Sequence, residues 1–380
     1  MRILAFWPKF PPFEPDRIGG LAVVVWELTR EMKRQGVDLE LATPVTTSAE
    51  QTEVEGIKVT SGALGKSLYW YLELPEEGRK DVLGYDGVLS FQGGGARPLT
   101  ACADVKGKVV RHLHNVMSAI PFAYSRKLQP GLAERVRRYL AKREQESNEK
   151  LLRGVRTVCV SLHLVDEMLA AGLEARQNLH SIPNGVDTKS FRPANAEKEF
   201  DLLFVGNFYW VKGVDIVLEA VGALHAGGLD AKLGIAGKFD GNQRKHLLDS
   251  MPPTVRGSVS FLGVVDRARM PGLMNSAKLV VVPSKYETFG MVALEAIACG
   301  VPVVATSVGA LPELVDSTVG RLASRPNAGD LAVAVGECLM DEELAEKCHA
   351  NGPRRAQGYD RNSAASRLEV VFDSSPSYDV

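Results

Sequence analysis

The chain has 380 residues, of which 45% are hydrophobic and 24% charged, as in an ordinary folded globular protein. This length exceeds a single hydrophobic core and favours two domains of roughly 150–190 residues each. The 45 Lys and Arg nearly balance the 46 Asp and Glu, so the net charge of −1 gives no reason to expect nucleic acid as a partner. No run of about 18 apolar residues predicts a membrane span, and the N-terminal stretch breaks at Pro8 without the pattern of a signal peptide.

The five cysteines are scattered, and none stands in a C-x-x-C pair. Their odd number and irregular spacing predict neither a disulfide framework nor a structural zinc site. Buried thiols in a reducing cytoplasm are the simplest interpretation.

The N-terminal stretch predicts a strand, a loop, a helix and a second strand. Residues 3–7 form a short apolar run, typical of a strand that is covered on both faces. A loop with four prolines follows and ends at Gly19-Gly20, before a helix whose apolar stripe runs to Met32. Residues 37–41 alternate as a second strand, and this order indicates a right-handed crossover in a parallel sheet.

The second half repeats this pattern of strands that end in glycine-containing loops, and a helix is predicted over residues 214–225. We therefore expect an α/β protein with two Rossmann-like domains. The strands predicted in the second half are 201–206, 232–237, 259–263, 278–283 and 301–305.

The Pro and Asn-Gly signals of residues 182–187 mark a turn between the two halves. We place an N-terminal acceptor-binding domain at 1–190 and a C-terminal nucleotide-sugar-binding domain at 191–360, functions that rest on the family resemblance given below. Residues 361–380 are expected to form a helix and tail that pack back toward the N-terminal domain.

Residues 125–156 carry ten Lys and Arg against four Glu. A solvated basic helix is the plain interpretation. A site for an acidic acceptor, or peripheral contact with an anionic membrane surface, is the alternative.

Several familiar signatures are absent. Gly65-Lys66-Ser67 lacks the first glycine of a P-loop, and the glycine run at 93–95 lacks G-x-G-x-x-G spacing. His112 and His114 stand without an accompanying carboxylate or cysteine cluster, so we expect no metal there. No D-x-D occurs, although paired aspartates are the usual way to hold a divalent cation on a nucleotide diphosphate.

The most informative segment is residues 279–313. A buried strand ends at Pro283, a polar loop carries Glu287, and a helix begins near Phe289-Gly290-Met291. The backbone N–H groups and dipole at a helix N-terminus can hold phosphate without a metal. Glu295 lies about 7.5 Å further along the helix axis, where a carboxylate can accept both ribose hydroxyls. Glu287 would face the sugar at the opposite end of the diphosphate.

This segment closely resembles the signature of the retaining GT-B glycosyltransferases of the glycosyl transferases group 1 family (family 4), with Glu287 and Glu295 matching its pair of glutamates. The resemblance extends over most of the chain. It includes Gly19-Gly20 and the stretches 182–187, 191–193, 206–213 and 261–263.

The resemblance implies a GT-B fold, with two Rossmann-like domains facing each other across a deep interdomain cleft. It implies that Lys212 pairs with the donor diphosphate, that the loop glycine Gly20 closes over the same phosphates, and that His114 lies beside the reacting sugar. The implied catalytic residues are thus His114, Lys212 and Glu287. The implied donor-binding residues are Gly19, Gly20, Gly206, Asn207, Lys212, Gly237, Glu287, Phe289, Gly290, Met291, Val292 and Glu295.

One position departs from the family pattern. Asn207 stands where the family usually has Arg, so one of the positive charges that would hold the donor diphosphate is missing. Lys238 or Lys285 could compensate, although both read more simply as solvated lysines.

The function implied by this resemblance is retaining transfer of a sugar from a nucleotide diphosphate sugar, first of all a UDP sugar, to a hydroxyl acceptor, with no metal or other cofactor. We expect a cytoplasmic enzyme, at the inner face of the membrane if residues 125–156 touch it. The alternatives are a nucleotide-sugar epimerase or hydrolase of the same fold, and a non-catalytic sugar-nucleotide-binding subunit. The donor sugar, the base, the acceptor and the oligomeric state stay open.

Overall fold

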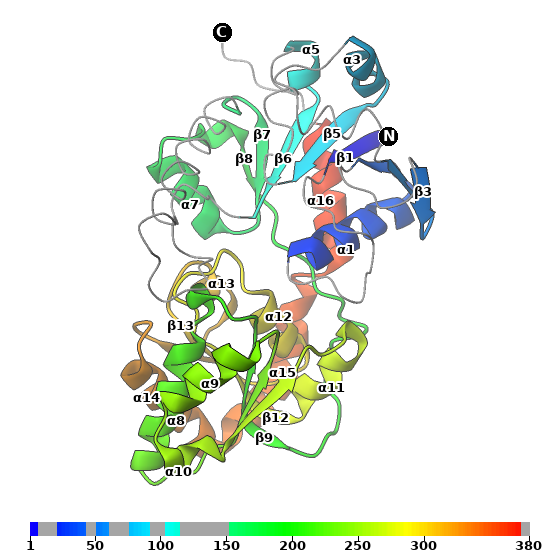
Figure 1. Cartoon of the computed structure of the whole chain (residues 1–380). Coiled ribbons are helices and arrows are strands. Elements are labelled where there is room, and N and C mark those ends of the chain that lie inside the picture. Colours follow the sequence, from blue (N-terminus) through cyan, green and yellow to red (C-terminus); the bar gives the residue numbers. More distant parts are fainter. Residues whose placement is uncertain (7–20, 43–50, 61–75, 92–102, 115–151, 374–380) are drawn as a thin grey trace. The chain divides into compact units, whose positions relative to one another are not determined.

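The computed structural model describes residues 1–6, 21–42, 51–60, 76–91, 103–114 and 152–373 (Figure 1). Gly19, Gly20 and most of the basic segment 125–156 lie outside these residues. The described chain divides into two compact units, described separately below. The first contains the described residues up to Gly185 and those from Arg361 on, and the second is Val186–Asp360.

The described strands of the first unit form one sheet in the order β3-β4-β2-β1-β5-β6-β7-β8. All neighbours are parallel except β3 and β4, an antiparallel hairpin whose turn holds Glu55 and Gly56 at φ 50° and 79°. Two such positive φ values fit the twist of a two-residue hairpin. The strands are β1 (Arg2–Phe6), β2 (Asp38–Ala42), β3 (Gln51–Val54), β4 (Ile57–Thr60), β5 (Gly87–Phe91), β6 (Val109–Leu113), β7 (Arg156–Cys159) and β8 (Leu179–Ser181).

Two helices from opposite ends of the chain pack together in the first unit: α1 (Leu21–Arg34) and α16 (Arg361–Asp373). The predicted stripe of α1 is buried from Val24 to Met32, and it shares a core cluster with the apolar side of α16. The unit also contains α3 (Glu76–Leu83), α5 (Ala103–Lys106), α7 (Leu162–Ala170) and the short η3 (Arg176–Asn178).

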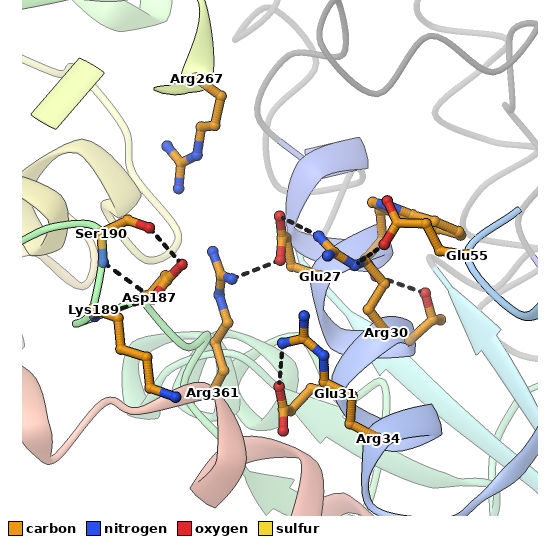
Figure 2. A network of polar contacts seen from close by, with 12 residues as sticks. Glu27, Arg30, Glu31, Arg34, Glu55, Asp187, Lys189, Ser190, Arg267 and Arg361 are labelled. Carbon is orange, nitrogen blue, oxygen red and sulfur yellow. Dashed lines mark hydrogen bonds and ion pairs between the residues drawn. The ribbon is translucent and has the colours of Figure 1, made fainter. Parts of the chain in front are cut away.

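Polar contacts fix α16 in place. Figure 2 shows Glu27 of α1 between two arginines. Its Oε2 lies 2.6 Å from Nη1 of Arg361, and its other oxygen pairs with Arg30. Arg30 in turn contacts Glu55 of the hairpin turn. At the other end of α16, Arg156 donates to the carbonyls of Val371 and Phe372 at 2.6 and 3.1 Å. A cation there complements the negative end of the helix dipole.

The chain leaves and re-enters the first unit at neighbouring points. A Cβ on Gly185 would lie 2.5 Å from the Cα of Arg361, so only a glycine fits there. Just beyond, within the second unit, Val186 forms a β-bridge with Asp360 and donates its N–H to the carbonyl of Tyr359 at 2.9 Å. Among the described residues, the second unit is therefore the single stretch 186–360, whose two ends meet.

The second unit is a parallel sheet in the order β11-β10-β9-β12-β13-β14. Each predicted strand of this half is found, with bounds shifted by no more than two residues. The strands are β9 (Phe200–Val205), β10 (Leu233–Ala236), β11 (Val259–Gly263), β12 (Ala277–Val282), β13 (Val303–Thr306) and β14 (Gly320–Ala323). The helices are α8 (Val214–Ala226), α9 (Gly241–Asp249), α10 (Pro253–Arg256), α11 (Met270–Asn275), α12 (Met291–Ala298), α13 (Leu311–Leu314), α14 (Ala328–Met340) and α15 (Glu342–Gln357), with short η4 (Trp210–Lys212) and η5 (Arg267–Arg269).

The order of these strands places a topological switch between β9 and β12. From β9 the chain moves outward through β10 to β11, and it then returns to β12 and moves the other way to β14. In open parallel sheets, ligands bind beyond the carboxyl ends of the strands at such a switch. The two loops that leave β9 and β12 there are residues 206–213 and 283–290.

Candidate functional site

The two switch-point loops bring together two of the predicted site residues. Lys212, at the end of the first loop, lies with its Nζ 2.7 Å from Oε2 of Glu287 on the second. Ser284 donates its hydroxyl to the same carboxylate oxygen at 3.4 Å. The lysine side chain is 33% exposed and the glutamate 13%, so the pair stands at the surface of the unit while remaining partly shielded from water.

The backbone locks these loops against each other. Gly213 has φ 69°, and a Cβ there would lie 1.9 Å from the carbonyl oxygen of Pro283. Lys285 donates its N–H to the carbonyl of Val211 at 2.8 Å. Only a residue without a side chain permits both the left-handed backbone and the close approach, so Gly213 fixes the distance between the loops.

The backbone of Glu287 is held from its far side as well. Ala310 donates its N–H to the Glu287 carbonyl at 3.0 Å. Gly309 has φ 56°, and a Cβ there would fall 1.8 Å from the same carbonyl oxygen. The backbone of Glu287 is thus fixed by close packing against Gly309 and Ala310.

Helix α12 begins where the sequence predicts it. Gly290 is the N-cap with φ 103°, Phe289 before it is buried, and Met291 opens the helix. The first N–H groups of a helix have no acceptor within it, and the helix dipole favours negative charge at this end. Gly290 contributes no side chain to cover these amides, and Val292 is half-buried within the first turn. A Cβ on Gly290 would lie 2.9 Å from a methyl group of Leu311, so the glycine also allows the close packing of α13. The first-turn amides of α12 are of the kind that can bind an anion.

Glu295 lies on the second turn of α12 and is buried among apolar residues. Its Oε1 forms an ion pair with Nη1 of Arg267 in η5. The Arg267 guanidinium also lies over the ring of Phe191, 4.4 Å from its centre. The sequence analysis missed Arg267. A glutamate inside an otherwise apolar helix predicts that some cation neutralises it, but the sequence does not say which.

Asn207 holds the loop after β9 to the loop after β10. Its Oδ1 accepts the backbone N–H of Lys238 at 2.9 Å, and Gly206 donates to the carbonyl of Ala236 at 2.8 Å. Gly237 has φ 153°, and a Cβ on it would meet the Gly206 carbonyl oxygen at 2.0 Å. The Asn207 side chain thus links the two loops by a hydrogen bond.

Of the two lysines named as substitutes for the missing cation, one is already engaged in other contacts. Lys285 is mostly buried; its Nζ lies 2.5 Å from Oδ2 of Asp215 and 4.6 Å from the ring centre of Trp210. The expectation of a solvated side chain was therefore wrong for Lys285. Lys238 is exposed, as expected.

His114 directly follows β6 in the first unit, and it is buried together with His112. Nδ1 of His112 lies 3.0 Å from Nε2 of His114, so one ring donates a hydrogen bond to the other. Burial lowers the pKa of His112 to about 3 and holds the pKa of His114 well below its usual range. Both rings are therefore neutral near pH 7, and His114 can offer a hydrogen bond but no charge.

The described ranges contain neither a cluster of metal ligands nor a membrane-spanning helix. Within those ranges, no three His, Cys, Asp or Glu side chains gather as metal ligands. None of the helices described there is long and apolar enough to cross a membrane.

Comparisons with known proteins agree with this architecture. The second unit matches the family model described as glycosyl transferases group 1 over residues 186–355, and the first half matches glycosyltransferase family 4 over residues 18–190. The two parallel sheets and the similarity to solved structures, given below, define a protein of the GT-B fold. The chain belongs to the glycosyl transferases group 1 family.

Curated relatives are similar over different shares of their length. D-inositol 3-phosphate glycosyltransferase 1 of Catenulispora acidiphila is 30% identical over 239 residues, which cover 58% of this chain and 57% of that protein. D-inositol 3-phosphate glycosyltransferase of Jonesia denitrificans is 29% identical over 93% of this chain and 91% of its own length. The chain spans 57% and 62% of the first two curated relatives.

Solved structures share the GT-B fold. Sucrose-phosphate synthase of Thermosynechococcus elongatus has a TM-score of 0.73 at 19% identity, with 98% of both chains covered. HepE of Anabaena, solved in complex with UDP-glucose, also has a TM-score of 0.73 at 19% identity, over 98% of this chain and 99% of its own.

Proposed function

We propose that this protein is a retaining glycosyltransferase that moves a sugar from a nucleotide diphosphate sugar to a hydroxyl acceptor without a metal ion. The observation that carries the proposal is the Lys212–Glu287 pair beside the N-terminus of α12, at the switch point of the second unit. One ammonium group, a row of helix amides and two carboxylates are the groups needed to bind a diphosphate and the sugars on either side of it.

In this proposal Lys212 and the amides of residues 289–292 hold the diphosphate. Negative charge on the diphosphate increases as the sugar leaves, so these groups stabilise the transition state more than the bound substrate. The ion pair with Glu287 keeps the lysine extended toward this position before the donor arrives. Donor phosphates would then share the ammonium group with the carboxylate.

Glu287 would orient the donor sugar through its hydroxyl groups, and Glu295 would accept hydrogen bonds from the ribose. A carboxylate that is already paired with Lys212 is a weak nucleophile, which supports orientation rather than covalent attack. We therefore propose front-face attack by the acceptor, whose proton passes to the departing phosphate. His114, neutral at pH 7, would contribute a hydrogen bond to the reacting sugar.

The similarity to HepE, which was solved with UDP and with UDP-glucose, supports UDP as the first nucleotide to test. Relatives named D-inositol 3-phosphate glycosyltransferase make a phosphorylated polyol the first acceptor to test. We place the reaction in the cytoplasm, and membrane contact through residues 125–156 remains part of the proposal.

The test combines the full chain with UDP-glucose, UDP-N-acetylglucosamine or GDP-mannose and a panel of acceptors that includes inositol 3-phosphate. Mass spectrometry detects the product, NMR reads its anomeric configuration, and EDTA is present in a parallel series. We expect a product of retained configuration whose rate is unaffected by EDTA. Inverted product, or activity that EDTA abolishes, contradicts the proposal.

Two further arms separate the alternative functions. Incubation with the donor alone would release free nucleotide or an isomerised sugar if the protein were a hydrolase or an epimerase. Binding of a donor without turnover on any acceptor would indicate a sugar-nucleotide-binding subunit. The hydrogen-bonding role of Asn207, which leaves the clamp with one cation fewer, is the observation that favours this last function.

A further inference from the structure

The ion pair between Arg267 and Glu295 lies among the buried apolar residues of the second unit, where charged side chains are rare. The Glu295 side chain is only 6% exposed, and its neighbours on α12, among them Leu294 and Ile297, are buried and apolar. Removing a carboxylate and a guanidinium from water is costly, and apolar side chains of similar volume often give equal or greater stability. A pair of charges retained in such a place is a candidate for a functional role.

Arg267 is fixed from two directions. One edge of its guanidinium bonds to the Glu295 carboxylate, and its flat face lies over the ring of Phe191 at 4.4 Å. Phe191 itself is almost fully buried and cannot move away. A planar guanidinium can form an edge contact and a face contact at once, whereas the ammonium group of lysine cannot reproduce both.

These contacts restrict the carboxylate as well as the arginine. A carboxylate has about four acceptor positions, and the bond from Arg267 does not by itself fill them. Because Arg267 cannot swing away, it holds Glu295 in one rotamer and compensates its charge. A carboxylate ordered in this way loses less conformational entropy when a ligand hydroxyl binds to it.

We infer that Arg267 is a positioning residue that holds Glu295 ready for the ribose hydroxyls of the donor nucleotide. The inference rests on the proposed function, in which Glu295 contacts the ribose. It assigns the site a preference for ribonucleoside over deoxyribonucleoside diphosphates, and it requires Arg267 to act through Glu295 rather than on the ligand directly.

Isothermal titration of the full chain tests this inference, with UDP and GDP as probes beside their 2′,3′-dideoxy forms. We expect the unaltered protein to bind the ribose form about tenfold or more tightly than the dideoxy form. Arg267→Met should lose about tenfold in affinity for the ribose form and none for the dideoxy form, and Arg267→Lys should lie in between. Arg269→Met removes an exposed arginine two residues further on and should change neither affinity.

A second pair of variants guards against misfolding, because Arg267→Met leaves the buried carboxylate without this cation. Glu295→Gln and the double variant Arg267→Met/Glu295→Gln both remove the carboxylate charge. If Arg267 acts only through Glu295, the double variant binds UDP with the same affinity as Glu295→Gln. An additional loss in the double variant, or an equal loss on ribose and dideoxy probes, overturns the inference and leaves the proposed transfer reaction standing.

Two outcomes with the unaltered protein are also decisive. Binding of UDP without preference for the ribose form refutes the roles of Glu295 and Arg267 while the diphosphate clamp survives. Failure to bind either nucleotide refutes the proposed donor site, and the inference with it.

Discussion

Replacement of Gly213 by alanine should disrupt the junction of the two switch-point loops. The new Cβ would lie 1.9 Å from the Pro283 carbonyl oxygen, at a residue whose φ is 69°. The left-handed conformation alone costs a residue with a Cβ about 1–2 kcal/mol. Relief of the overlap requires a backbone shift, which adds about 1–3 kcal/mol. We therefore expect a loss of about 2–5 kcal/mol in the free energy of unfolding.

Gly228 provides a matched control at the other end of α8. Its φ is 86°, close to that of Gly213, but a Cβ there would meet nothing within 4 Å. Gly228→Ala should therefore cost only the conformational part, about 1–2 kcal/mol. Urea unfolding of both variants isolates the cost of the overlap as the difference between them.

The same substitution should also impair function, because a shift of the loop moves Lys212 away from Glu287. Misplacement by about 1 Å can reduce a rate by about a hundredfold. UDP titration and product formation should decline in Gly213→Ala and remain near normal in Gly228→Ala. Equal destabilisation of the two variants, together with unchanged nucleotide binding, would refute the view that this glycine sets the geometry of the site.

Three further predictions follow from contacts described above. Lys212→Met should lower kcat by at least about a hundredfold through loss of transition-state charge stabilisation. Lys245→Met, on the exposed face of α9, should leave kcat unchanged. Full activity of Lys212→Met would refute the role of Lys212 in holding the diphosphate. Burial holds the pKa of His112 in the folded state near 3, below its value in the unfolded chain, so the stability that depends on the neutral ring is complete above about pH 6.5 and declines as the pH falls toward 3. His112→Asn should reduce this loss of stability at acid pH, measured by urea unfolding at several pH values. An unchanged loss would contradict the assignment. Arg156→Met removes the donors to the Val371 carbonyl and should speed amide hydrogen exchange in α16 while leaving α12 unchanged; equal exchange in both forms would show that the arginine does not hold the helix.

Much of the second unit could be predicted from local sequence alone. Parallel strands buried on both faces read as continuous apolar runs, so β9, β10 and β12 were found within one residue of their bounds. The start of α12 was equally clear, because a polar loop, a glycine and an apolar helix follow one another around Gly290.

The interactions missed by the sequence analysis all depend on tertiary structure. Arg267 meets Glu295 across 28 positions, and Lys285 meets Asp215 across 70. No periodicity links such residues, since the fold alone brings them together. Asn207 illustrates the same limit. In the sequence it indicates only that a positive charge is missing, whereas in the structure its side chain forms a hydrogen bond between two loops.

Within the described residues, the neighbouring positions of Gly185 and Arg361 make residues 186–360 an insertion in the first unit. A replacement for residues 186–360 would join the described chain at two neighbouring positions, and the buried α1–α16 surface would not be cut by the exchange. Grafting residues 186–360 from a relative with another donor is thus a direct route to chimeric enzymes. Under the proposed function, the grafted part of such a hybrid would select the nucleotide sugar and the recipient would keep its own acceptor.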